Sequence, residues 1–389
     1  MVPVFKVLTV LVMIIGIVVV LIPVLELVSL GIWKLFIEDS LAKLDARAYY
    51  PPYDNFEDKE EFFKEKGDLV ANNYTSGQQY QPFYLWSEKE SSGKWHNIKA
   101  NGDRVTFFNL EGDDKAGAIR VFTFGGSTMW GAGSPDDATI PSWLAKFMNE
   151  GEGKYVVENM GQNGHVSSQE LIRLILELRN GNIPDIVVFL DGGNDAACAL
   201  RPGNPYAHLN YNHVAATFSF NPSYYLNLVS GRPYIRRLTN HVVNKLSKGK
   251  HKTVSSLTPV SESKVKMVEK NAPVSADVWI NNTIFIKKLS GIYGFKAICI
   301  LQPVLYTRKE PLLPYERELW ERDPVAKVSY GLVFPEFRKK LQEGDYPWVY
   351  DLTDIFDGTG VPAFIDAIHY GPGGNEVIAR RIRDIIISN

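Results

Sequence analysis

The chain has 389 residues, enough for one large domain or two small ones, and its apolar and charged fractions (45% and 22%) are ordinary for a globular protein. A formal net charge of -2 gives no reason to expect a nucleic acid or another polyanion as a partner. Cys198 and Cys299 are the only cysteines, so the sequence has no disulfide framework and leaves the redox compartment open.

Residues 7–25 contain no charged side chain. As an α-helix they would measure about 28 Å, close to the hydrocarbon thickness of a bilayer, about 30 Å. A cleaved signal peptide is the alternative, but the apolar run is long and no convincing small-x-small cleavage site follows it. We therefore predict a retained transmembrane anchor over 1–33, whose orientation the flanking charges determine poorly.

Residues 34–76 are rich in charges of both signs and predict a solvated juxtamembrane spacer. The following residues, 77–117, contain an aromatic-rich segment and the turn dipeptide Asn101-Gly102 between two short runs. We expect a small β extension there, packed on a main domain that spans 77–389.

From residue 119 onward, short apolar runs alternate with amphipathic stretches. The runs predict five strands, at 119–124, 155–158, 185–190, 296–301 and 348–350. Helices are predicted over 140–148, over 171–178 behind a capping box from Ser167 to Glu170, and over 373–387. This alternation predicts an α/β fold, a three-layer α/β/α sandwich with a central parallel five-stranded sheet.

An insertion over 201–275 separates the third and fourth predicted strands. It is rich in Pro, Asn and Tyr at first and carries a basic run later. A solvated excursion is the favoured interpretation. A cap near the active site, or a patch held against anionic lipid head groups, is the alternative.

Small polar residues follow the ends of three of the predicted strands: Gly126-Ser127, Asn163-Gly164 and Gly192-Gly193-Asn194-Asp195. Because the carboxyl ends of parallel strands share one edge of a sheet, these loops are expected to converge. Taken alone, Ser127 could merely cap the next helix. Near the C-terminus, Asp366 and His369 are three residues apart, so the carboxylate can orient the imidazole as the acid–base half of a nucleophilic triad.

In this order, Ser127, Gly164, Asn194 and His369 resemble the four blocks of the SGNH (GDSL-type) hydrolase superfamily, which is named after these residue types. The resemblance covers roughly 119–387 without the insertion and implies a flavodoxin-like fold. One departure is visible, because the first block has Gly-Gly-Ser-Thr where the family has Gly-Asp-Ser-Leu. Gly126 thus replaces an aspartate that is not the catalytic acid, which leaves the local loop packing open.

The resemblance implies that Ser127 is the nucleophile, that His369 is its base and that Asp366 orients His369. The backbone N–H groups of Ser127 and Gly164, together with the Asn194 side chain, would form an oxyanion hole. Residues near strand ends that could line a substrate pocket, with packing as the alternative, are Trp130, His165, Asp191 and Gln302.

These observations favour a membrane-anchored serine esterase that removes an acyl group, with acetyl preferred, from a carbohydrate or lipid through an acyl-enzyme. Neither a metal nor an organic cofactor is expected. The alternatives are an O-acyltransferase that passes the acyl group to a sugar hydroxyl of an envelope polysaccharide, and a non-catalytic binding module on the same fold. The resemblance also favours an extracytoplasmic catalytic domain, while the sequence does not indicate an oligomeric state.

Overall fold

The computed structural model describes residues 16, 20–37, 45–65, 77–201, 204–218, 238, 260–309 and 311–388. The chain divides into two compact units, Met1–Lys43 with Asn210–Ser255 and Leu44–Leu209 with Ser256–Asn389. In the first unit, the described residues form a helix over 20–32 that continues as η1 (Trp33–Ile37), and a second helix, α8 (Tyr211–Phe218). All residues of the predicted active site belong to the second unit.

The predicted anchor lies mostly outside the described residues, as does most of the predicted insertion. Among the helices that the structure does describe, none has both the length and the apolar character needed to cross a membrane.

The second unit is built on a sheet of five parallel strands in the order β4-β3-β5-β6-β7. The strands are β3 (Ile119–Gly125), β4 (Tyr155–Asn159), β5 (Ile186–Asp191), β6 (Lys296–Leu301) and β7 (Val349–Asp351). Every residue of β5 is buried, as expected for the central strand of a sheet covered on both faces. The predicted fold class and all five strands are confirmed.

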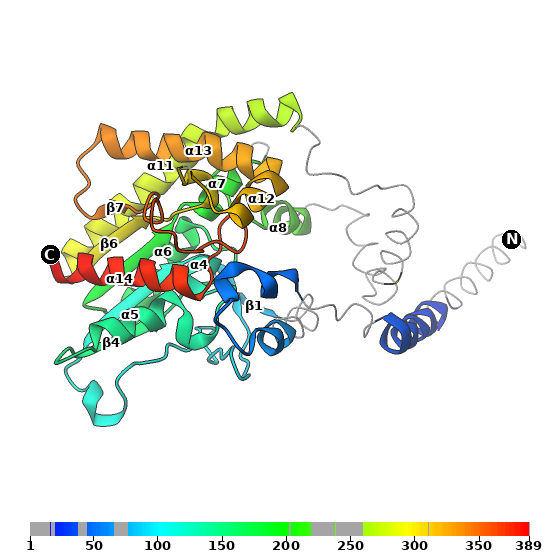
Figure 1. Cartoon of the computed structure of the whole chain (residues 1–389), viewed down its shortest axis with the longest axis horizontal. Helices are drawn as coiled ribbons and strands as arrows, with labels where there is room; N and C mark the ends of the chain where they lie inside the picture. Colours follow the sequence, from blue (N-terminus) through cyan, green and yellow to red (C-terminus); the bar gives the residue numbers. More distant parts are fainter. Residues whose placement is uncertain are drawn as a thin grey trace, which may run out of the picture. The chain divides into compact units, whose positions relative to one another are not determined.

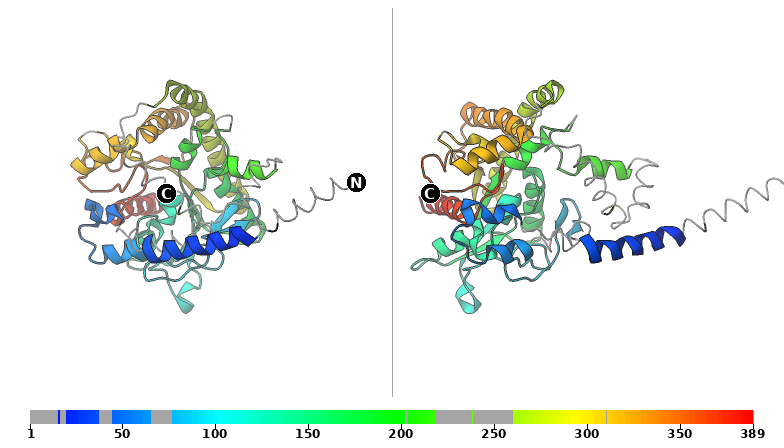
Figure 2. Two further views of the ribbon diagram at one scale, coloured as in Figure 1. Left: turned by 90° about the vertical axis from the view of Figure 1, so that its right-hand side faces the viewer. Right: turned by 45° about the vertical axis from the view of Figure 1, so that its right-hand side comes forward.

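Successive side chains of a strand point to opposite faces of the sheet, and the two faces have separate cores. Val121 and Val188 pack with α5 (Ile140–Met148) and α14 (Pro372–Ser388). Phe122 and Phe189 pack with α6 (Ser167–Arg179) and α11 (Glu262–Tyr293). On the face covered by α6 and α11, α13 (Pro324–Glu343) packs against α11 (Figures 1 and 2). The short helix α12 (Pro314–Arg322) precedes α13 in the chain.

Short elements follow three of the strands at the carboxyl edge of the sheet. They are α4 (Ser127–Trp130) after β3, with η5 (Asp136–Ala138) beyond it, α7 (Gly193–Cys198) after β5, and η6 (Leu305–Thr307) after β6. The loop after β4 leads into α6, and the residues before α14 return to the same edge, since Leu305 N donates to Ala367 O. This edge holds the candidate site.

The structure corrects the prediction of a solvated spacer for residues 45–65, the described part of 34–76 that belongs to the second unit. Residues 45–65 form η2 (Ala46–Tyr49), η3 (Pro51–Tyr53) and a helix over 59–65, all within the second unit. Tyr53 and Phe62 are fully buried there against Ile365. Most charged residues of this segment are exposed, whereas most of its aromatic residues pack inward. Because the charges outnumber the aromatic residues, the sequence pattern does not reveal the buried face.

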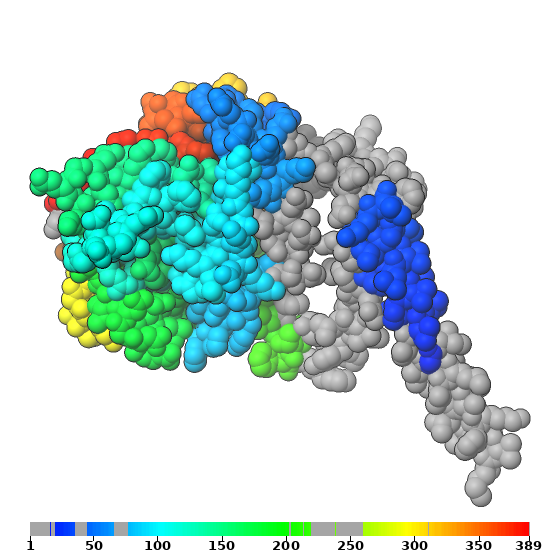
Figure 3. Space-filling model, turned by 90° about the horizontal axis from the view of Figure 1, so that it is seen from below, coloured from blue at the N-terminus to red at the C-terminus, as the bar shows by residue number. Residues whose placement is uncertain are grey.

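The expected β extension forms a hairpin of β1 (Gln78–Gln81) and β2 (Leu85–Glu88), and η4 (Gly112–Lys115) follows it. The predicted Asn101-Gly102 turn is present, with Gly102 at φ +87° and an Ile98–Arg104 bridge beside it. Figure 3 shows this cyan extension beside the blue residues 45–65 on one face. The predicted insertion ends earlier than expected, because α11 already begins at Glu262.

Candidate active site

Ser127 occupies the first position of α4, one residue beyond the end of β3, and 9% of its surface is exposed. Its hydroxyl oxygen lies 2.6 Å from Nε2 of His369, a residue 242 positions further along the chain. The carbonyl oxygen of Ser127 accepts hydrogen bonds from the N–H groups of Gly131 and Ala132, which close the turn behind the hydroxyl. The structure therefore brings together the two residues that the sequence proposed as nucleophile and base.

The Asp366 carboxylate lies behind the imidazole of His369. His369 Nδ1 is 2.9 Å from Oδ1 and 2.7 Å from Oδ2 of Asp366. The carboxylate also accepts hydrogen bonds from the backbone N–H groups of Ile368 and His369. An ionised carboxylate can only accept, so the proton must reside on Nδ1, which leaves Nε2 free to accept the Ser127 hydroxyl proton.

The surroundings of Asp366 keep its carboxyl group ionised. Burial by itself raises the pKa of Asp366, but the imidazole of His369 and the two backbone donors outweigh burial and hold that pKa below its usual range. The guanidinium of Arg47 adds a positive charge, with Nη1 3.8 Å from Asp366 Oδ2. Arg47 lies in the segment predicted to be a solvated spacer, so no sequence pattern marks it as part of the site.

The three loops proposed to form the oxyanion hole also meet. Asn194 Nδ2 donates to the carbonyl oxygen of His165 over 2.7 Å. A β-carbon placed on Gly126 would lie 2.3 Å from that Nδ2 and 3.3 Å from the same carbonyl oxygen, so the loops after β3, β4 and β5 are in contact. Gly164 has φ +76°, a conformation that glycine adopts without strain.

The β extension holds the loop that carries Gly164. Trp86 Nε1 donates to Asn163 O over 2.9 Å, and Glu88 N donates to the Gln162 side chain over 2.8 Å. The imidazole of His165 is hydrogen-bonded to Trp86 O. The extension therefore positions one of the proposed oxyanion donors from outside the α/β/α core.

The predicted capping box from Ser167 to Glu170 is wrong. Val166, not Ser167, is the cap residue of α6, and the Ser167 hydroxyl instead donates to Asp195 over 2.5 Å. Glu170 points inward, where burial and the neighbouring carboxyl of Asp191 raise its pKa well above the usual value. A carboxylate at this position signals a cap in the sequence, and only the packing of α6 on β5 shows that it is buried.

Three carboxyl groups, on Glu170, Asp191 and Asp195, are thus buried near the Asn194 turn. Burial raises the pKa of each of them, and for Asp191 it raises the pKa to about 8. The charge of Asp195 adds to the rise for the other two. The sequence did not indicate that Glu170 and Asp195 lie beside the site.

The four residues predicted to line a substrate pocket are all buried, and their assignment to a pocket stays a prediction. Trp130 is 8% exposed and stacks under the guanidinium of Arg104. Burial lowers the pKa of His165 to about 3, so this imidazole is neutral near neutral pH. Asp191 belongs to the buried carboxyls, and Gln302 is 3% exposed between Thr128 and Tyr370.

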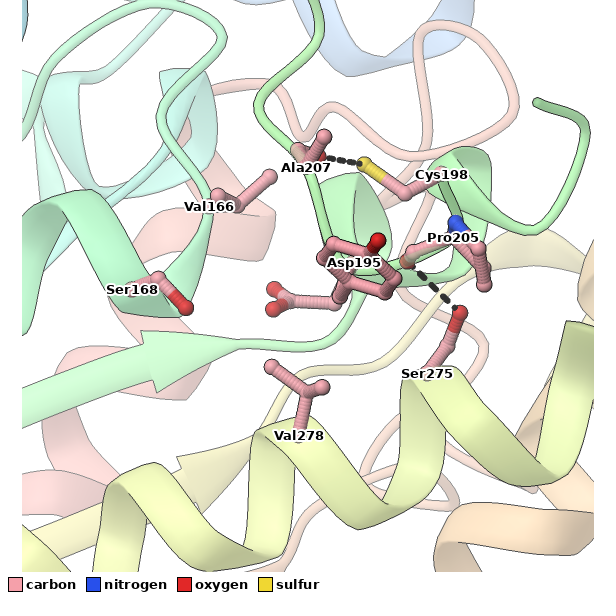
Figure 4. Close-up of a pocket in the computed structure, with 9 residues that line it drawn as sticks. Val166, Ser168, Asp195, Cys198, Pro205, Ala207, Ser275 and Val278 are labelled. Carbon is pink, nitrogen blue, oxygen red and sulfur yellow. Dashed lines mark hydrogen bonds between the residues drawn. The ribbon is translucent and has the colours of Figure 1, made fainter. Parts of the chain in front are cut away.

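A small pocket of about 10 Å³, room for about one water molecule, lies beside α7 (Figure 4). Its lining residues are Val166, Ser168, Asp195, Cys198, Pro205, Tyr206, Ala207, Ser275 and Val278. Asp195 points its carboxylate into the space between Ser168 and Val278, while the Cys198 thiol donates to Ala207 O. Ser127 and His369 do not line this pocket, so it is not assigned to the substrate of the triad. Among the described residues, no group of His, Cys, Asp or Glu side chains is arranged to hold a metal ion.

No family model and no curated protein matches this chain. Solved structures with similar folds include a member of the lipolytic G-D-S-L family from Veillonella parvula, at 10% identity and a TM-score of 0.32 over 69% of this chain and 99% of that one. An extracellular lipase from Streptomyces rimosus matches at 12% identity and a TM-score of 0.36, over 69% and 99% of the two chains. The acetyl xylan esterase AlAXEase matches at 11% identity and a TM-score of 0.30, over 69% of this chain and 100% of that one. Likeness at this level gives no grounds for transferring an activity or a substrate to this chain.

Proposed function

We propose that this protein is a serine esterase that works through an acyl-enzyme. The observation that carries the proposal is the hydrogen-bonded chain from the Ser127 hydroxyl through His369 to Asp366. A serine hydroxyl is a weak nucleophile until a neighbouring base accepts its proton. His369 Nε2 is at the right distance to do so and is in the right tautomer.

In the acylation step, the Ser127 oxygen attacks the ester carbonyl carbon while His369 accepts the hydroxyl proton. Asp366 stabilises the resulting imidazolium, which then gives its proton to the leaving alcohol. The developing oxyanion accepts hydrogen bonds from the backbone of Ser127 and Gly164 and from Asn194. Nδ2 of Asn194 carries two N–H groups, and one of them already holds the amide against His165 O.

The acyl group then leaves Ser127 with water or with the hydroxyl of an acceptor. We favour hydrolysis of an ester, preferably an acetyl ester, on a carbohydrate or lipid, because the site needs nothing beyond water to complete the cycle. Transfer to a sugar hydroxyl uses the same residues, and product analysis in the presence of acceptor glycans separates the two reactions.

The test is hydrolysis of 4-nitrophenyl acetate by the full chain in detergent micelles, compared with Ser127→Ala. Labelling by a fluorophosphonate probes the same hydroxyl without a choice of substrate. Ser263→Ala, an exposed serine of α11, is the matched control and should be labelled like the wild type. Equal hydrolysis by the wild type and Ser127→Ala would exclude the esterase mechanism and favour a binding module.

We further propose that residues 1–33 anchor the protein in a membrane with the catalytic unit outside the cytoplasm. Support comes from the uncharged run over 7–25 and from the family resemblance. Protease digestion of intact cells tests the orientation, and full protection of the catalytic unit would contradict it.

A further inference from the structure

Residues 45–65, here called the strap, lie against both halves of the candidate triad. On the nucleophile side, the hydroxyl of the buried Tyr53 donates to Gly133 O over 2.5 Å. Gly133 follows the turn that closes on the Ser127 carbonyl. A β-carbon on Gly133 would lie 2.2 Å from Ile365 Cδ1 and 3.1 Å from the Tyr53 hydroxyl oxygen, so the strap contacts the point where the two loops meet.

On the acid–base side, the strap packs on both ends of the segment that carries Asp366 and His369. Ile365 is fully buried in a cluster with strap residues Ala48, Tyr53, Phe62 and Phe63. Beyond His369, a β-carbon on Gly371 would lie 2.5 Å from Cβ of Pro52. Figure 1 shows the blue strap beside the start of the red α14, and η3 contacts that helix.

The strap also brings charge to the triad. Arg47 Nη1 lies 3.8 Å from Asp366 Oδ2, and Asp45 holds the same guanidinium at 2.5 Å. These side chains are about a third exposed, so the charges interact through partial solvent screening.

The other titratable groups that interact with Asp366 are phenols. They are Tyr53 of the strap, Tyr306 of η6, Tyr330 of α13 and Tyr370. Burial raises the pKa of each of these tyrosines, so they stay neutral over the range in which an esterase works. Among the described residues other than His369, the charged side chain that acts on Asp366 is therefore Arg47, which in turn is paired with Asp45.

We infer that the strap takes part in the reaction through Arg47 and Asp45. These two positioning residues carry opposite charges, which have opposite effects on the protonation of the Asp366–His369 pair. This inference rests on the proposed esterase function. The positive charge of Arg47 disfavours protonation of the nearby imidazole, whereas the negative charge of Asp45 favours it. The two residues should therefore move the acid limb of the activity profile in opposite senses.

The experiment measures kcat/KM for 4-nitrophenyl acetate from pH 5 to 9 with the full chain in detergent micelles. Arg47→Ala should move the acid limb to higher pH by about half a unit, the size expected of one partly screened charge. Asp45→Asn should move it to lower pH, and Arg47→Lys, which keeps the charge, should leave it near the wild-type position. A purely structural role for the strap would lower activity without moving the limb.

Lys94→Ala is the matched control, because Lys94 pairs with Asp58 and Glu61 of the strap at exposed positions. Its removal breaks these exposed ion pairs with the strap without changing the charge next to Asp366, so the limb should stay in place. Should Arg47→Ala fail to fold in a thermal melt, Asp45→Asn and Arg47→Lys still carry the test. An active wild type with the same acid limb in all Arg47 and Asp45 variants would overturn the inference. A wild type that neither hydrolyses the ester nor reacts with the fluorophosphonate would instead remove the proposed function.

Discussion

The side-chain amide of Asn194 stands in the space that a β-carbon on Gly126 would need, with Nδ2 2.3 Å from that position. The backbone of Gly126 is extended (φ -74°, ψ -152°), so any residue could adopt its conformation and only the close approach requires glycine. In this chain, the contact explains why a residue without a β-carbon suits position 126. A larger residue at 126 and the observed rotamer of Asn194 exclude each other.

Gly126→Ala should therefore lower kcat by displacing Asn194, by up to about 10²–10³-fold if the whole donor is lost. KM and the melting temperature should change less, because the sheet core is not touched. The measurement is steady-state hydrolysis together with a thermal melt. Gly331→Ala in α13 is the control, since a β-carbon there meets nothing within 4 Å and should leave kcat unchanged. Full activity in Gly126→Ala would show that the position of Asn194 does not matter for the reaction.

Asn194→Ala should lower kcat by about 10²–10³-fold, with little change in KM, because it removes a donor needed only in the transition state. It should also cost about 1–3 kcal/mol of stability, since His165 O loses its donor. Kinetics at a temperature where both proteins are fully folded separate the two effects. If activity falls only in proportion to the unfolded fraction, the role of Asn194 is structural.

Asp366→Asn should lower kcat by about 10⁴-fold, because an amide can donate to Nδ1 and so turn the imidazole to the wrong tautomer. The rate of fluorophosphonate labelling should fall with it, since both depend on proton transfer from Ser127 to His369. Asp357→Asn, at a carboxylate that accepts from Lys309 N away from the triad, serves as the control. A labelling rate within a few-fold of the wild type would contradict the proposed role of Asp366.

The buried carboxyls should make the protein less stable as the pH rises. Burial raises the pKa of Asp191 to about 8, so between about pH 4 and pH 8 the unfolded chain has released a proton that the folded protein still holds. The free energy of unfolding should then decrease toward alkaline pH, by up to about 1.4 kcal/mol per pH unit for one such group.

Asp191→Asn should flatten this dependence, because an amide carries no titrating proton. Denaturant unfolding at several pH values between 5 and 9 measures the slope, and the exposed Asp113→Asn is the control. An unchanged slope in Asp191→Asn would mean that this carboxyl does not hold its proton over the pH range.

Much of the fold could be predicted because its signals are local. Apolar runs at regular intervals predicted the five strands, and the Asp366-x-x-His369 spacing predicted that these two side chains face each other. The strap could not be predicted, because Phe62 and Tyr53 are scattered among charged residues and their partner Ile365 is some 300 positions away. The orientation of the predicted pocket residues could not be predicted for a related reason, since position after a strand does not reveal which way a side chain points.

By itself, the sequence determined which residues could do chemistry at one edge of a parallel sheet, because strand order along the chain and small residues at strand ends are local properties. Only the tertiary structure decided how charges and atoms surround them: that Arg47 reaches Asp366, that Asn194 leaves room only for glycine at 126, and that three carboxyls are buried beside the same turn. Burial and Coulomb energy depend on distances between residues far apart in the chain, and only folding sets those distances.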